Sequence, residues 1–174
     1  DNTNTNQENF NSRTYIFQVD SLGALEWEYL SPANQLRDIA YSMVKTPDGG
    51  LVVASARGIE HVINADVSIL LWQGYLFKLN ANHQQVWGRD LRGTRHTLGP
   101  VFAKVVPATD GAGFVAYGRI GETVSNGTEQ YGSWVVKVSN QGDSLWARYY
   151  TFFDGHDRRP EPIDFKSTPD GGYI

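Results

Sequence analysis

A repeated pair of segments constrains the fold of this chain more than any other feature. Each copy has a hexamer that starts with an aromatic residue and has aromatic or aliphatic residues at its first, third and fifth positions. A short polar turn follows, and then a tryptophan seven residues after the hexamer ends. The copies are residues 15–20 with Trp27, 75–80 with Trp87, and 134–139 with Trp146. Successive copies start 60 and 59 residues apart, and a fixed period of this size is typical of a repeat architecture.

A second motif recurs between these copies and contains an Asp-Gly or Asp-Gly-Gly turn. It occupies residues 46–50, 109–113 and 168–172. Such a pair between alternating segments predicts a hairpin, because the tight turn needs a positive φ angle. We therefore expect a strand on each side of the motif, so that each repeat holds four short strands. The expected strands before the motif are 41–45, 102–106 and 163–166, and those after it are 51–55, 114–117 and a stub at 173–174.

The hexamers alternate with the period of a β-strand. Tyr15, Phe17 and Val19 share one face, and the later copies have aromatic or aliphatic residues at the same positions. The opposite face begins apolar and ends polar. Because a strand that is apolar on both faces is buried between neighbouring layers, the pattern predicts sheets stacked on one another.

The turn after each hexamer has one position at which we expect a positive φ angle. Two copies have Gly23 and Gly142 there, and the third has His83. Histidine is one of the few residues other than glycine that are enriched at positive φ. We therefore interpret His83 as a turn residue, not as a functional histidine.

These features predict an all-β fold with the layout of a β-propeller. No segment shows a convincing helical period, and four-stranded units repeated along a chain are the signature of propeller blades. The Thr-Pro-Asp-Gly-Gly turn, the hexamer at 75–80 and the tryptophan strand together resemble a propeller-type repeat of secreted and surface proteins from Bacteroidetes. The order of these segments is also similar to that in WD and kelch blades.

The resemblance covers residues 14–174 and implies one propeller domain over residues 1–174. We expect a partial blade at 14–30, complete blades at 39–91 and 101–150, and a partial blade at 162–174. These make three blade-equivalents, whereas propellers have roughly four to eight blades. We therefore expect a segment of a larger ring in a longer natural protein, and association of two such chains is the alternative.

Charge and composition argue against several functional classes. The net charge is −4 and the pI is about 5.5, whereas nucleic-acid-binding domains carry a basic patch. No apolar run has the eighteen residues of a spanning helix, so we expect no transmembrane segment. The chain has no cysteine and none of the phosphate-loop, zinc or nucleophile-elbow motifs. We therefore expect no cofactor, no metal and no nucleic-acid partner.

The lengths of the connections predict where a ligand binds. We expect long loops between the second and third strands of each repeat, at 57–74 and 119–132. The connections between repeats, at 31–38, 92–100 and 151–162, are also long. In an antiparallel unit all of these emerge on one side, and function concentrates in loops held by a rigid scaffold. We therefore place the binding surface on this long-loop face.

Six residues of this face are candidate ligand contacts: Trp72, Arg95, His96, Tyr131, His156 and Arg158. Trp72 and Tyr131 lie at the expected loop ends, either as exposed aromatic anchors or as caps of the core. Arg95 and His96 belong to a basic cluster. His156 and Arg158 belong to a charged segment that fits a metal or acid–base site, or a solvated loop with internal ion pairs.

Two charged residues align in the first strand of neighbouring repeats, Lys104 and Asp164. In related propellers this strand lines the central channel. We expect these side chains to form an ion pair between repeats that serves structure, not catalysis.

The function that we predict is non-catalytic. It is an extracellular or cell-surface binding or scaffold module that uses the long-loop face for a protein partner or a glycan. A subunit of an outer-membrane complex, with protein neighbours on its loops, is one form of this function. The alternative is a glycan-active hydrolase or lyase with carboxylates at the channel mouth, which sequence cannot identify because their separation in space decides the chemistry.

Overall fold

The part of the chain that the structure describes consists of β-strands, turns and connections. The computed structural model describes residues 12–33, 37–64, 67–92, 97–123, 129–151 and 164–174. Ten strands form three antiparallel sheets, and these residues contain no helix. The expected all-β class is confirmed. The strands are β1 Tyr15–Val19, β2 Leu25–Leu30, β3 Arg37–Lys45, β4 Leu51–Asn64, β5 Val67–Leu79, β6 Gln85–Leu91, β7 Thr97–Pro107, β8 Phe114–Thr123, β9 Glu129–Val138 and β10 Ser144–Thr151.

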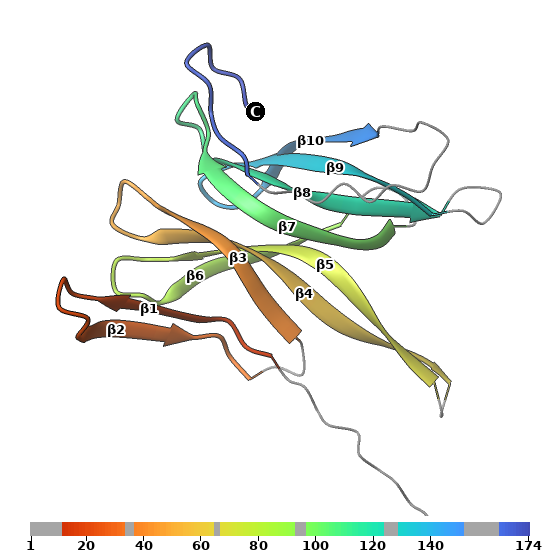
Figure 1. Ribbon diagram of the computed structural model, residues 1–174, viewed down its shortest axis with the longest axis horizontal. Coiled ribbons are helices and arrows are strands. Elements are labelled where there is room, and N and C mark those ends of the chain that lie inside the picture. Colours follow the sequence, from red (N-terminus) through yellow and green to blue (C-terminus); the bar gives the residue numbers. More distant parts are fainter. Residues whose placement is uncertain (1–11, 34–36, 65–66, 93–96, 124–128, 152–163) are drawn as a thin grey trace, which may run out of the picture.

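The three sheets are stacked face to face in the order of the sequence (Figure 1). The first has only β1 and β2, the second has the order β3-β4-β5-β6, and the third has the order β7-β8-β9-β10. Neighbours in each sheet are consecutive in sequence, so every connection within a sheet is a hairpin. The tight turns lie together on one side of the stack, at the left in Figure 1. The two complete sheets thus have the four strands expected for each repeat.

The expected long loops at 57–74 and 119–132 are wrong. Strands β4 and β5 stay paired from Arg57 opposite Gln73 as far as Asn64 opposite Val67, and β8 and β9 stay paired as far as Thr123 opposite Glu129. The stretch 59–71 contains neither glycine nor proline and is rich in β-branched residues, which favour continued strand pairing. Two long hairpins therefore replace the expected loops.

Strand β5 shows why the sheets stack. Tyr75, Phe77 and Leu79 are at most 5% exposed and face β1 and β2, whereas Leu76 is fully buried in the core between the second and third sheets. The expected burial on both faces is confirmed. Burying a large apolar side chain contributes about 1.5–3 kcal/mol, so this strand stabilises both interfaces. A third core lies between the last sheet and the segment 164–174, around Val115, Val135 and Phe165.

The turns after the hexamers are closed by the last hexamer residue. The Asp20 side chain accepts hydrogen bonds from the backbone N–H groups of Leu22 and Ala24, both over 2.8 Å. Asn80 and Ser139 make the same pair of bonds in the later copies. The φ angles of Gly23, His83 and Gly142 are 86°, 61° and 83°. The prediction that His83 adopts positive φ is confirmed.

Candidate functional site

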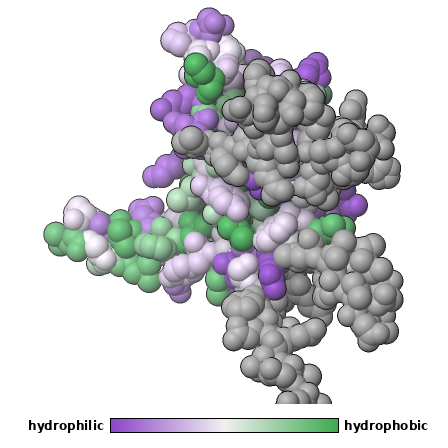
Figure 2. All heavy atoms as spheres, turned by 45° about the vertical axis from the view of Figure 1, so that its right-hand side comes forward, coloured by the Kyte–Doolittle hydropathy of each residue, from purple (hydrophilic) through white to green (hydrophobic). Residues whose placement is uncertain are grey.

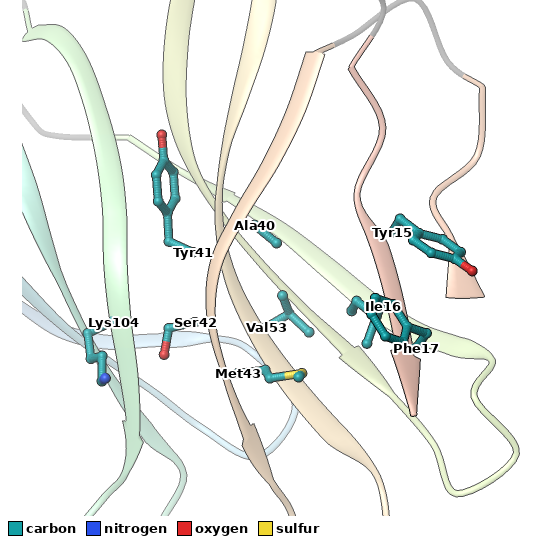
Figure 3. A pocket seen from close by; sticks show the side chains of 9 residues that line it. All are labelled: Tyr15, Ile16, Phe17, Ala40, Tyr41, Ser42, Met43, Val53 and Lys104. Carbon is teal, nitrogen blue, oxygen red and sulfur yellow. The ribbon is translucent and has the colours of Figure 1, made fainter. Parts of the chain in front are cut away.

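A cavity of about 490 Å³ lies beside β1, between this strand and β3 (Figure 3). Strands β1, β3, β4 and β7 each supply part of its wall. In Figure 3, Phe17 and Ile16 lie on the β1 side, and Lys104 lies on the β7 side, facing Ser42. The cavity is lined by Tyr15, Ile16, Phe17, Ala40, Tyr41, Ser42, Met43, Val53 and Lys104.

The residues that line this cavity are mostly apolar, but polar and apolar atoms contribute similar shares of its surface, and the cavity is open to solvent. The side chains of Tyr15, Phe17, Tyr41 and Met43 are all more than half exposed. The Tyr15 hydroxyl donates to Glu28 over 2.6 Å, and this hydrogen bond, with a minor contribution from burial, raises the pKa of the phenol. A wall of this kind suits an occupant with both apolar and polar groups.

The polar side chains at the far end of the cavity already have partners. The Ser42 hydroxyl accepts a hydrogen bond from the backbone N–H of Val105 over 3.4 Å. Lys104 Nζ lies 3.1 Å from Asp164 Oδ1. The predicted ion pair between Lys104 and Asp164 is therefore confirmed. Hydrogen bonds from Lys166 and then Lys104 hold the pKa of Asp164 well below its usual range, so this carboxylate stays ionised at neutral pH.

A buried ion pair occupies the second sheet where it faces β1 and β2. Arg57 Nε lies 2.9 Å from Asp38 Oδ1, and the two side chains are 12% and 4% exposed. The guanidinium also lies 3.3 Å from the centre of the Tyr75 ring and 3.5 Å from Asp90 Oδ1. Burial alone lowers the pKa of Arg57, but its hydrogen bond to Asp38 and nearby charges raise it overall. The cluster takes one residue from each of β3, β4, β5 and β6. Because these residues are far apart in the sequence, no sequence motif identified it.

Two of the six predicted ligand contacts occupy equivalent positions in the complete sheets. Trp72 on β5 lies opposite Gly58, and Tyr131 on β9 lies opposite Gly121. Both are half-buried. They lie inside strands, so their expected position at loop ends is wrong. The sequence already indicated that the two positions are equivalent, because each aromatic residue precedes the first residue of its hexamer by three positions.

The two aromatic residues have different contacts. A Cβ atom added at Gly99 of β7 would lie 3.2 Å from the Trp72 Cβ atom, so this tryptophan packs against the next sheet. The Arg119 guanidinium lies 5.6 Å from the centre of the Tyr131 ring. The contact of Trp72 fits the reading of this residue as a cap of the core, and both residues remain partly exposed.

The other predicted contacts, Arg95, His96, His156 and Arg158, lie outside the described residues. In the part of the chain that is described, no three His, Asp or Glu side chains are grouped as metal ligands. No helix of this part is long and apolar enough to cross a membrane.

Comparison of the chain with protein-family models and with curated proteins gives no match. The sequence repeat of the chain and the geometry of its fold are therefore the basis for a functional proposal.

Proposed function

We propose that this chain is a segment of a β-propeller-type scaffold with a non-catalytic binding role. On this proposal it acts in the extracellular space or on the cell surface, as repeat proteins of the Bacteroidetes type do, or within an outer-membrane complex. The rim formed by the β4–β5 and β8–β9 hairpins binds a protein partner or a glycan.

The equivalence of Trp72 and Tyr131 carries this proposal. The repeat places one partly accessible aromatic ring on the same rim of each complete sheet, and stacked sheets lie about 10 Å apart. Tyrosine and tryptophan suit binding surfaces because they combine a large apolar area with a polar tip. A row of such rings fits an extended ligand, such as a sugar chain or a peptide segment.

The use of charged groups supports a non-catalytic role. Lys78 pairs with Asp48, Lys137 pairs with Asp110, and Arg57 pairs with Asp38. The lysine partners lower the pKa values of Asp48 and Asp110. A general acid needs a pKa near the working pH, so these carboxylates suit structure better than proton transfer.

A binding assay with rim variants tests the proposal. The labelled chain is applied to an array of polysaccharides, and a photo-crosslinking residue at position 131 captures protein neighbours in cells of the native source. We expect Trp72→Ala and Tyr131→Ala to weaken binding at least tenfold. Val86→Ala and Leu145→Ala are matched controls, because both residues are 53% exposed on the outer strands β6 and β10.

Three outcomes would contradict the proposal. One is equal loss of binding in the rim variants and the controls. Another is the absence of both a glycan ligand and a protein neighbour at position 131. Release of soluble sugars from an arrayed polysaccharide would instead favour the enzyme alternative.

A further inference from the structure

The β4–β5 hairpin extends beyond the strands on either side of it (Figure 1). Strand β3 accompanies β4 only as far as Gly58, and β6 accompanies β5 only as far as Gly74. The two central strands continue to pair with each other beyond these points. We call residues 58–64 and 67–72 the ribbon. Among the described residues, no third strand pairs with β5 over 67–72 or with β4 over 59–64.

The ribbon belongs to the second sheet, which has the first sheet on one face and the third on the other (Figure 1). The apolar side chains of the first sheet are exposed on the outside of the stack, where Figure 2 shows hydrophobic residues gathered on the projecting lobe of β1 and β2. The ribbon differs from that surface, because both sheets that flank it are described. Its open edges follow from the unequal lengths of four strands within one complete sheet.

The third sheet covers more of its own central hairpin. Strand β7 pairs with β8 as far as Glu122, one residue before the end of β8. Strand β10 pairs with β9 as far as Gly132, so that only residues 129–131 of β9 extend past it. The long open edge is therefore particular to the second sheet and is not a consequence of the repeat.

The other edges of the two complete sheets have features that discourage pairing with another chain. On the inner side, β3 has a bulge at Tyr41 and β7 has one at the equivalent Ala103. On the outer side, β6 and β10 each have an arginine two positions after the tryptophan, Arg89 and Arg148. Bulges and charged side chains both protect exposed edges of sheets.

The β5 edge of the ribbon has none of these features. Residues 67–72 read Val-Ser-Ile-Leu-Leu-Trp and contain no charged residue, proline or glycine. Their pairing with β4 runs without a bulge from Trp72 to Ser68. Leu71 is 37% exposed. A regular, uncharged segment of high β-propensity at an open edge is a template for another strand.

The chemistry of this edge favours a strand as its occupant. The backbone N–H and C=O groups along an open edge are matched in spacing by the backbone of an added strand. A two-stranded ribbon is only marginally stable in water, and three or more strands are needed for independent stability. An added strand therefore satisfies the edge and stabilises the ribbon.

The distribution of charge selects a second copy of the same edge. Like charges that lie directly opposite each other destabilise paired strands. Because residues 67–72 are uncharged, two copies of this segment meet without repulsion. A contact between two β4 edges would instead include Glu60 of both copies.

We propose that residues 67–72 pair antiparallel with the same residues of a second copy of the chain, about a two-fold axis. The two ribbons then form one four-stranded sheet in the order β4-β5-β5-β4. Two-fold contacts of a surface with itself are the commonest form of oligomer interface. The contact uses the backbone of the ribbon, so it goes beyond the ligand binding by aromatic rings proposed above.

Single cysteines locate the axis, because the chain has no cysteine of its own. The residue on a two-fold axis lies opposite its own copy, and the midpoint of 67–72 places this residue at Ile69 or Leu70. Paired residues on antiparallel strands have Cα atoms about 4.5–5.5 Å apart, within the range for a disulfide. Under mild oxidation we expect Ile69→Cys or Leu70→Cys to form a linked species of twice 19.4 kDa.

Val86→Cys is the matched control for this linkage. Val86 is 53% exposed and lies on β6, the outer edge strand of the same sheet. We expect this variant to remain unlinked under the same conditions. Linkage of Val86→Cys as readily as both ribbon variants would overturn the proposal, because it would indicate random collision.

A charge exchange gives a second measurement. Ile69→Lys and Ile69→Glu each place like charges close to the axis. A contact between two short strands is of the small, weak class, so the mass is measured by light scattering at about 100 µM. We expect the natural chain to be dimeric and each variant alone to dimerise at least tenfold more weakly. An equimolar mixture of the two variants is expected to recover the dimer, which also shows that both variants fold.

Two results of this measurement would overturn the proposal. One is a natural chain that is monomeric at this concentration. The other is a mixture of Ile69→Lys and Ile69→Glu that dimerises no better than either variant alone, because the two edges would then not face each other.

Discussion

The Trp27 ring stacks on the imidazole of His83, with ring centroids 3.8 Å apart and ring planes 14° from parallel. Trp27 belongs to the first sheet, and His83 belongs to a turn of the second. Trp87 makes the corresponding contact with the third sheet, where its indole N–H donates to the Asn140 carbonyl over 3.1 Å. The tryptophans of the first two sequence repeats therefore attach their sheets to a turn of the next one.

Replacing His83 separates the stacking from the turn conformation. His83→Ala loses the ring contact and keeps the positive φ of 61°, so we expect the free energy of unfolding to fall by about 1 kcal/mol. His83→Gly also loses the ring, but it relieves the backbone strain, so a smaller loss is expected. Urea unfolding measures both. Equal stability of His83→Ala and the natural chain would contradict a role for the stack.

Substitutions of two glycines measure how closely the Gly142 turn approaches Trp87. Gly142 and Gly111 have φ angles of 83° and 71°, so alanine is strained at both. A Cβ atom at Gly142 meets the Trp87 ring at 2.8 Å, whereas Gly111 has no described atom within 4 Å. We expect Gly142→Ala to be less stable than Gly111→Ala by about 1–3 kcal/mol, the usual cost of overpacking. Equal losses in thermal unfolding would show that the turn moves away without cost.

The Asp38–Arg57 pair is expected to matter more for stability than the Lys104–Asp164 pair. Asp38→Ala removes the closest acidic partner of Arg57, whose side chain is only 12% exposed, and leaves the more exposed Asp90 as its partner. Loss of one partner of a buried pair costs about 3–5 kcal/mol. Lys104 and Asp164 are 38% and 43% exposed, so solvent screens that pair. Chemical denaturation of Asp38→Ala and Lys104→Ala compares them, and a larger loss for Lys104→Ala would contradict this ranking.

Local patterns predicted much of the strand arrangement. The Asp-Gly turns and the alternation in 75–80 located the hairpins and the strands with two buried faces. The alignment of Lys104 with Asp164 also predicted their ion pair, because equivalent strands of stacked repeats lie side by side.

Features that depend on long-range pairing were not predicted. Residues 57–74 have the length of a loop, and only the register of β4 with β5 shows that they continue the hairpin. The Asp38–Arg57–Asp90 cluster draws on three strands with no common motif. The cavity beside β1 likewise depends on the relative placement of three sheet edges. Each of these features requires the tertiary arrangement, which a local period does not contain.

The pairing of Asp48 with Lys78 makes stability depend on pH in the acid range. Lys78 Nζ lies 2.6 Å from Asp48 Oδ2, and this hydrogen bond, followed by one from Thr46, lowers the pKa of Asp48 from 3.8 to about 2. The folded chain therefore binds this proton more weakly than the unfolded chain. The stabilisation is complete above about pH 4, and it is lost as the pH falls through about 2.

We expect the urea concentration at the midpoint of unfolding to decrease as the pH is lowered from 4 to 2. The decrease should be less steep in Asp48→Asn. Lys78→Met removes the cation and should return the pKa of Asp48 toward 3.8, as measured by NMR titration of its carboxyl carbon. The same direction is expected for Asp110, whose pKa is lowered first by Lys137, so Asp110→Asn provides a parallel test in the third sheet. An Asp48 carboxyl that titrates near 3.8 in the natural chain would show that the ion pair does not persist in solution, and the pH dependence of stability would then have another source.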